Sequence, residues 1–296
     1  MTKPTIGIIG TGKMGMPFAT NLLRAGYNVV AFNRSSESLE TLTELGATRL
    51  HSIADVAAGA DFVLTSLTNQ QSVRDVYLGS GGLVENARQG QIYIETSTND
   101  IALVKEIADA LDARGADLLD SPVSGGVPGA EAGSVTVMAG GEESVYNAAL
   151  PILDVIGGNI HHLGPVGAGT AMKLVNQLLV GVNMAAVAEA LIFGASAGAS
   201  PDKILEVIST SFGGSKMLDR GVPLIRDRNF APATPVNLIR KDMGIVMESA
   251  DANALPLNIT REALALFNRA HNDGLGENDM TAIVLPLEKD SDLTVS

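Results

Sequence analysis

The chain has 296 residues, enough for one large or two medium-sized domains with a substantial core. Its formal net charge of −13 argues against nucleic-acid or anionic-membrane binding through a general basic surface, but leaves room for one local phosphate pocket. The chain has no cysteine, which excludes disulfides, thiol catalysis and thiolate metal sites, and its four scattered histidines give no convincing metal cluster. We therefore expect a cytoplasmic protein without a metal or a signal peptide.

Strands and helices are predicted to alternate through the first half of the chain. Short apolar strands are expected, about eight in all, including those at 5–10, 28–33, 61–67, 91–97, 116–123, 134–139 and 159–163. Helices are expected between them, with Gly26 and Gly46 ending the first two. Such alternation predicts right-handed crossovers and an α/β fold with a doubly wound, mostly parallel sheet.

The second half is predicted to be all-helical. Residues 170–199 contain no proline and few charges, and their apolar side chains surround a helix on all sides. A helix of this kind is buried, so we expect a long central helix that also packs against a partner subunit. Asn176, Gln177, Asn183 and Glu189 interrupt it, which argues against a membrane span. We place one domain at 1–164 and the second at 165–296.

A glycine-rich loop follows the first strand and opens the first helix, the context that a G-x-G-x-x-G pattern requires. The first glycine allows a tight turn, the second lets backbone amides approach a pyrophosphate, and the third lets helix and sheet pack closely. We predict dinucleotide binding here, although a structural glycine turn is the alternative. The residues are Gly10, Thr11, Gly12, Lys13, Met14 and Gly15.

The end of the second strand predicts the cofactor. NAD sites usually place an acidic residue there to bind the ribose hydroxyls, but this chain has Asn33, Arg34, Ser35 and Ser36. Arg34 and the neighbouring hydroxyls suit a 2′-phosphate. We therefore favour NADP(H) over NAD(H); alternatively, Arg34 is a solvated turn residue and both cofactors are accepted. Leu67, which ends the third strand, is a further candidate cofactor contact.

Two further segments carry candidate chemistry. Ser124, Gly125 and Gly126 follow a strand at the ligand-binding edge of the sheet and suit a carboxylate, although a flexible crossover would also need glycines. Lys173 opens the long apolar helix, and Asn176 shares its face. A buried lysine is costly and shifts its pKa readily, so it is a candidate proton donor or acceptor; a lysine extending to water is the alternative.

Four motifs together resemble the β-hydroxyacid dehydrogenase family, which includes 3-hydroxyisobutyrate dehydrogenase and tartronate semialdehyde reductase. The resemblance runs from end to end and is specific in combination. Small departures are Ser121, where alanine is commoner, and Gln177, where many members have a second asparagine. The motifs are the glycine loop with Met16-Pro17, the segment Asp120-Ser121-Pro122-Val123-Ser124-Gly125-Gly126, the segment Lys173-Leu174-Val175-Asn176-Gln177, and Lys241-Asp242.

The resemblance implies a Rossmann domain, a helical domain around a long helix, and a homodimer or homotetramer. It implies that Lys173 is the catalytic acid and base, that Asn176 orients lysine and substrate, and that Ser124-Gly125-Gly126 bind the substrate carboxylate. Thr98 would line the nicotinamide pocket, and Lys241 would close the site. From the residues alone, Lys241-Asp242 is an ordinary solvated pair.

The predicted function is reversible hydride transfer between a nicotinamide cofactor and a short 3-hydroxy acid or its semialdehyde. A tartronate semialdehyde or other short semialdehyde reductase is the alternative within the family. Imine reductases are similar but usually lack the lysine, and decarboxylating 6-phosphogluconate-type enzymes are longer and carry histidine–asparagine after it. A non-catalytic dinucleotide-binding scaffold is the remaining alternative. The sequence leaves the substrate open.

Overall fold

The computed structural model describes residues 3–35 and 37–295 and divides the chain into two compact units, with the division after Lys173. The predicted domain boundary, after Gly164, lies nine residues before this division and stays a prediction. The first unit is α/β and the second is helical, as the fold class predicted.

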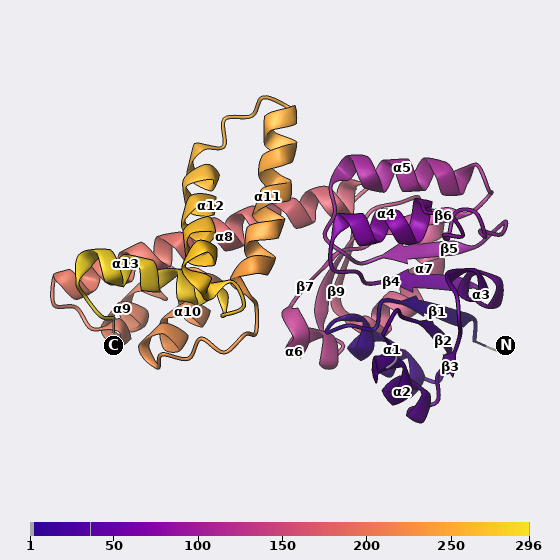
Figure 1. The fold of residues 1–296 in the computed structure, drawn as a ribbon, viewed down its shortest axis with the longest axis horizontal. Helices are drawn as coiled ribbons and strands as arrows, with labels where there is room; N and C mark the ends of the chain where they lie inside the picture. The colour runs from indigo at the N-terminus through magenta and orange to yellow at the C-terminus, as the bar shows by residue number, and fades with distance from the viewer. Residues whose placement is uncertain (1–2, 36, 296) are drawn as a thin grey trace. The chain divides into compact units, whose positions relative to one another are not determined.

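Six parallel strands form the central sheet in the order β3-β2-β1-β4-β5-β6 (Figure 1). The register aligns the carboxyl ends of four neighbouring strands: Ile9 pairs with Thr65, Thr65 with Glu95, and Glu95 with Asp120. Residues that follow these strands therefore leave the sheet at one edge, where ligands bind in such folds. The strands are β1 Thr5–Ile9, β2 Asn28–Phe32, β3 Thr48–Arg49, β4 Phe62–Thr65, β5 Ile92–Glu95 and β6 Asp117–Asp120.

A second, three-stranded sheet corrects one expectation. The predicted strand at 116–123 is interrupted, and its last part becomes β7 Val123–Ser124, which pairs antiparallel with β8 Val135–Ala139. Pro122 separates the two pieces, since proline has no N–H to donate to a ladder. β9 Gly157–His162 pairs parallel with β8.

Helices cover both faces of the central sheet because its side chains alternate between two cores. Leu64 packs in the core with α1 Gly15–Arg24, α2 Glu37–Glu44 and α7 Glu143–Ile156. Val63, its neighbour in β4, packs in the opposite core. Buried strands with two apolar faces are typical of a parallel sheet. The opposite core is formed with α3 Ile53–Gly59, α4 Gln70–Leu78 and α5 Ile101–Asp112.

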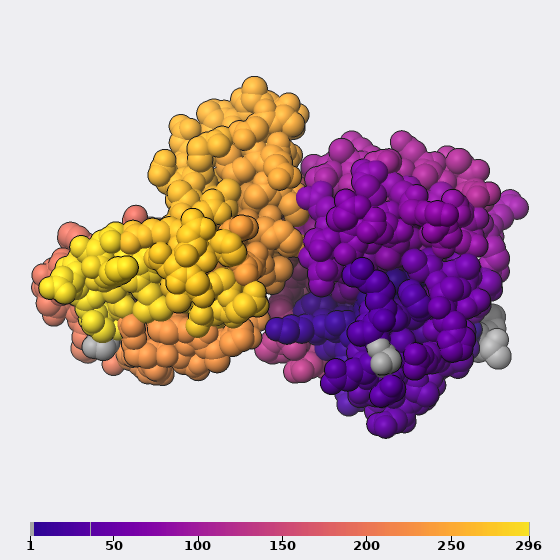
Figure 2. Space-filling model, viewed as in Figure 1, coloured from indigo at the N-terminus to yellow at the C-terminus, as the bar shows by residue number. Residues whose placement is uncertain are grey.

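The second unit is built around α8 Ala168–Ser196. Met184, Ala188 and Leu191 on this helix are fully buried in a core with the later helices. In the space-filling view, the orange and yellow helices cover the visible face of this unit and α8 shows mainly at its edge (Figure 2). The later elements are α9 Pro201–Ile208, α10 Lys216–Arg226, α11 Val236–Ala252, α12 Asn258–Ala270, η1 His271–Leu275, η2 Met280–Ile283 and α13 Val284–Ser291.

By length and composition alone, α8 could also cross a membrane, contrary to our expectation from its polar interruptions. One face of α8 packs in the helical core through the buried side chains above, while 28% of its 18-residue apolar window is buried. Its other face carries exposed apolar residues, among them Val175, Leu179 and Phe193.

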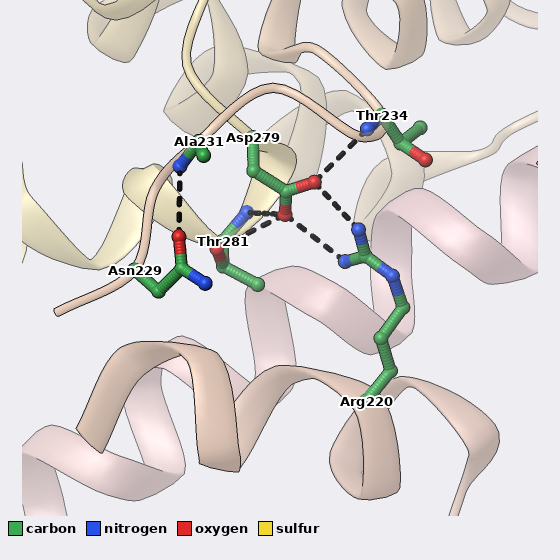
Figure 3. Close-up of polar contacts among 6 residues, drawn as sticks. All are labelled: Arg220, Asn229, Ala231, Thr234, Asp279 and Thr281. Atoms are coloured by element: carbon green, nitrogen blue, oxygen red, sulfur yellow. Dashed lines mark hydrogen bonds and ion pairs between the residues drawn. The ribbon is translucent and has the colours of Figure 1, made fainter. Parts of the chain in front are cut away.

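A buried carboxylate joins three segments of the helical unit (Figure 3). Asp279 receives two hydrogen bonds from the Arg220 guanidinium, at 3.0 and 2.5 Å, and backbone N–H bonds from Thr234 and Thr281. Burial alone would raise the pKa of Asp279, but the bonds from Arg220 and Thr234 outweigh it and hold the pKa below its usual value. The carboxylate therefore stabilises the turn before η2 in its charged form.

Candidate functional site

The glycine loop lies between β1 and α1, as predicted, and its glycines meet different demands. Gly10 has φ of 89°, and a Cβ there would collide with the Ser66 carbonyl; one on Gly15 would collide with the Gly10 carbonyl. The protein itself therefore requires both glycines. A Cβ on Gly12 would meet no atom within 4 Å, so the protein leaves open space there. That space suits the close approach of a phosphate group.

The remaining loop residues differ in exposure. Thr11 is buried, Lys13 is exposed and Met14 is half-buried. The Thr11 hydroxyl lies 2.5 Å from that of Ser38, which also accepts a hydrogen bond from the Asn33 amide at 3.1 Å. These bonds fasten the glycine loop to the end of β2, so two segments predicted to bind one cofactor are held together.

The end of β2 carries the predicted phosphate-binding residues. The Asn33 amide donates to the Ser35 hydroxyl at 2.9 Å, while Arg34 is exposed. The structure thus orders the turn through Asn33 and leaves the guanidinium of Arg34 to solvent. Ser36, the other predicted hydroxyl, lies outside the described residues.

The segments after β4 and β5 are joined by a buried network that was not apparent from the sequence. The Glu95 carboxylate accepts hydrogen bonds from the Thr65 hydroxyl and the Ser97 backbone N–H, each at 2.5 Å. The Ser97 hydroxyl in turn accepts the Leu67 backbone N–H at 2.8 Å. Burial raises the pKa of Glu95. Leu67 and the half-buried Thr98, both predicted cofactor contacts, therefore lie on segments fixed by one carboxylate.

Lys173 lies beside the predicted carboxylate-binding loop. Lys173 is buried, and its Nζ donates to the Val123 carbonyl oxygen at 2.7 Å. Val123 directly precedes Ser124, and Gly125 and Gly126 follow with φ of 143° and 63°, which favours glycine at both. The structure thus brings together two sites that lie about fifty residues apart in the sequence.

Asp120 fixes the start of the helix that carries Lys173. Its Oδ1 accepts the Gly167 N–H at 2.8 Å and its Oδ2 accepts the Thr170 N–H at 2.7 Å. Burial raises the pKa of Asp120 to about 6, against the lowering effect of these bonds. In the sequence, Asp120 was noted only as part of a family motif. The available signal for its structural role was its position as an acidic residue at the end of an apolar strand.

In the helical unit, a second polar network joins α8 to α11. The Gln177 amide nitrogen donates to Asp242 Oδ2 at 2.5 Å, and the Gln177 oxygen accepts from the Asn176 amide at 2.8 Å. The Lys241 ammonium lies 3.0 Å from Asp242 Oδ1. Asp242 and Gln177 are buried, so Lys241-Asp242 is not a solvated surface pair. Asn176 and Lys241, which nothing in the residue pattern connects, both join the buried pair Gln177 and Asp242.

Two family models together match most of the chain. A model described as the NAD binding domain of 6-phosphogluconate dehydrogenase matches residues 5–164. A second, described as the NAD-binding of NADP-dependent 3-hydroxyisobutyrate dehydrogenase, matches residues 167–287. A 2-(hydroxymethyl)glutarate dehydrogenase from Eubacterium barkeri is 37% identical over 98% of this chain and 97% of its own length. The chain belongs to the β-hydroxyacid dehydrogenase family.

Other similar proteins agree with this membership. An L-threonate dehydrogenase from Cupriavidus necator is 35% identical over 94% of each chain. A solved structure of 3-hydroxyisobutyrate dehydrogenase from Mycobacterium tuberculosis with L-serine matches with a TM-score of 0.91 and 29% identity, over 97% of this chain and 99% of the other. The resemblance found in the sequence is therefore confirmed. As a β-hydroxyacid dehydrogenase, the protein is an NAD(P)-dependent oxidoreductase acting on CH–OH groups.

Proposed function

We propose that this β-hydroxyacid dehydrogenase interconverts a short 3-hydroxy acid and its semialdehyde, with Lys173 as the proton donor and acceptor. The observation that carries the proposal is the 2.7 Å hydrogen bond from Lys173 Nζ to the Val123 carbonyl, because it holds the ammonium next to Ser124. The names of similar proteins support a short, polar hydroxy acid: 2-(hydroxymethyl)glutarate, L-threonate and 3-hydroxyisobutyrate.

The predicted residues that lie in the α/β unit have defined tasks in this reaction. A bound nicotinamide supplies or accepts the hydride. Neutral Lys173 removes the hydroxyl proton during oxidation, and its ammonium returns a proton to the forming alcohol during reduction. The Ser124 hydroxyl and the loop amides at Gly125 and Gly126 bind the carboxylate. The loop containing Gly12 would hold the pyrophosphate of the cofactor, and the segments of Leu67 and Thr98 would line the nicotinamide pocket.

A substrate screen with two lysine variants tests this proposal. Purified protein is assayed with 3-hydroxyisobutyrate, glycerate, 4-hydroxybutyrate, L-threonate and 3-hydroxypropionate, each with NADP⁺ and NAD⁺, by the absorbance of the reduced nicotinamide. In Lys173→Met, we expect turnover to fall at least about 10²-fold while cofactor binding is retained. Lys203→Met, which removes an exposed lysine of α9, is the matched control. Near-normal turnover in Lys173→Met, or reduction of a cyclic imine without turnover of any hydroxy acid, would contradict the proposal.

The preference for NADP is a separate part of the proposal and depends on Arg34. An exposed guanidinium at the end of β2 is available for bidentate hydrogen bonds with a 2′-phosphate. Because a hydrogen bond to a charged group contributes about 1.5–3 kcal/mol, Arg34→Leu should raise KM for NADP⁺ by about 10- to 100-fold and leave KM for NAD⁺ unchanged. Arg49→Leu, in the exposed strand β3, is the control. Wild-type protein that strongly prefers NAD⁺ would show the assignment to be wrong.

We also propose a homodimer or homotetramer in the cytoplasm, without a nucleic-acid or membrane partner. The exposed apolar residues Val175, Leu179 and Phe193 support a second copy packing along α8. Light scattering coupled to gel filtration measures the mass, and a monomer at all concentrations would contradict this part.

A further inference from the structure

The hydrogen bonds around Asp242 fix which way the amide of Asn176 points. A free amide can be turned either way, because its oxygen and nitrogen are alike in shape. An ionised carboxylate only accepts hydrogen bonds, so the Gln177 amide must present its nitrogen to Asp242. The Gln177 oxygen then faces Asn176 and accepts from its nitrogen at 2.8 Å. The buried carboxylate of Asp242 thus sets the polarity of this chain of two amides, that is, which way the nitrogen and oxygen of Gln177 and Asn176 point.

The consequence concerns the oxygen of Asn176. Because its nitrogen is held by Gln177, Asn176 Oδ1 is kept on the side away from Gln177. Lys173 precedes Asn176 by three residues on α8, a spacing that shares one helix face. Resting on the proposed function, we propose that Asn176 acts as a hydrogen-bond acceptor toward the reacting proton, and that Gln177 and Asp242 are positioning residues that set this polarity.

The position of Asp242 supports this role over a simple pairing with Lys241. Its side chain is almost fully buried, whereas that of Lys241 is 28% exposed. Asp242 Oδ1 lies 3.0 Å from the ammonium but outside hydrogen-bond alignment, while Oδ2 makes the shorter bond to Gln177. The carboxylate is therefore directed at the amide, and Lys241 compensates its charge.

A pair of mutations that reverses the chain of amides provides the test. In Asn176→Asp, an acceptor faces the acceptor oxygen of Gln177, and in Asp242→Asn, the direction of Gln177 is no longer fixed. In the double variant, Gln177 can turn around, donate to the new carboxylate at position 176 and accept from the new amide at position 242. The carboxylate at position 176 then keeps a second oxygen for the reacting proton. We expect each single variant to lose about tenfold in kcat, and the double variant to recover to within about threefold of wild type.

Two further variants separate this from a structural role. Asn176→Leu has no acceptor, so it should lose about 10²-fold or more, and adding Asp242→Asn should not restore it. Asp251→Asn makes the same change at an exposed acid of α11, and should leave kcat unchanged and fail to restore Asn176→Asp. Losses that simply add in the double variant, or equal activity of Asn176→Asp and Asn176→Leu, would overturn the proposal.

Urea unfolding of the same variants separates this proposal from the proposed function, since it needs no substrate. The midpoint should fall in each of Asn176→Asp and Asp242→Asn and return toward the wild-type value in the double variant. If wild-type protein oxidises no hydroxy acid, the proposed function fails. The urea midpoints of the single and double variants still show whether Asp242 orients the two amides. If wild-type protein is active but neither kcat nor the midpoint recovers, the polarity fails and the function stands.

Discussion

Asp120 in the α/β unit and Asp279 in the helical unit are both fully buried, and both hold a turn by accepting two backbone N–H groups. They differ in charge compensation, because Asp279 also receives both arms of Arg220. The pKa of Asp279 is accordingly lowered, whereas burial raises the pKa of Asp120 to about 6.

The difference shows what each region is optimised for. Asp279 holds Thr234, before α11, against the turn at η2, and its guanidinium partner makes the charged form favourable. Asp120 fixes the helix that carries Lys173, and it keeps its position at an electrostatic cost. Carboxylates with a strongly perturbed pKa cluster at functional sites.

The largest loss of stability is expected from removing the Asp279 carboxylate. Asp279→Ala leaves Arg220 and two backbone N–H groups without their acceptor, so we expect the free energy of unfolding to fall by about 3–5 kcal/mol at neutral pH. Because the folded pKa is lowered, the Asp279 contribution is present at neutral pH and is lost as the pH falls below about 3.8. Urea unfolding monitored by circular dichroism measures both. A loss under about 1 kcal/mol would mean that Asp279 is not a principal stabiliser.

The pH dependence at Asp120 should be the opposite of that at Asp279. A raised folded pKa means that the folded protein holds the Asp120 proton more tightly, so its stabilising effect is present below pH 3.8 and is lost as the pH rises through about 6. A shift of this size corresponds to about 3 kcal/mol. Relative to Asp120→Asn, which does not titrate, wild-type stability should therefore fall by about that amount from acidic to neutral pH. Parallel pH profiles of the two proteins would contradict it.

The smallest effect is expected at an exposed pair. Arg74 and Glu106 make the same two-bond arrangement as Arg220 and Asp279, at 2.8 and 2.6 Å, but both side chains are nearly half exposed. Water and salt screen such a pair, so Arg74→Ala should leave the urea midpoint unchanged within error. If Arg74→Ala lowers the urea midpoint as much as Asp279→Ala does, burial does not explain why the Arg220–Asp279 pair stabilises the protein more.

The sequence predicted those elements whose side chains repeat with a clear period. The apolar strands and the glycine loop lie where their patterns indicated, and α8 extends over 29 residues as its long apolar run suggested. The two-residue strands β3 and β7 were missed as separate elements, because two residues cannot display a period. Pro122 was the available signal that the strand before it would end.

The polar networks could not be predicted, because each joins residues far apart in the sequence. Glu95 stood at the end of an apolar strand, but its partner Thr65 lies thirty residues away. Gln177 and Asp242 are separated by 65 residues, and the residue pattern alone indicated that Asp242 belongs to a solvated pair with Lys241. One sequence shows which residues can form hydrogen bonds, but the packing of helices and strands decides which of them meet.

The division between the two compact units falls inside α8, between Lys173 and Leu174, and not in a loop. A helix has no flexible joint for a protease to enter, so limited digestion should not release the two halves as intact fragments. Separate expression of residues 1–164 would leave the Asp120 carboxylate without Gly167 and Thr170 and would remove Lys173 altogether. A single cut at the predicted boundary would therefore separate Asp120 from the start of the helix that it holds.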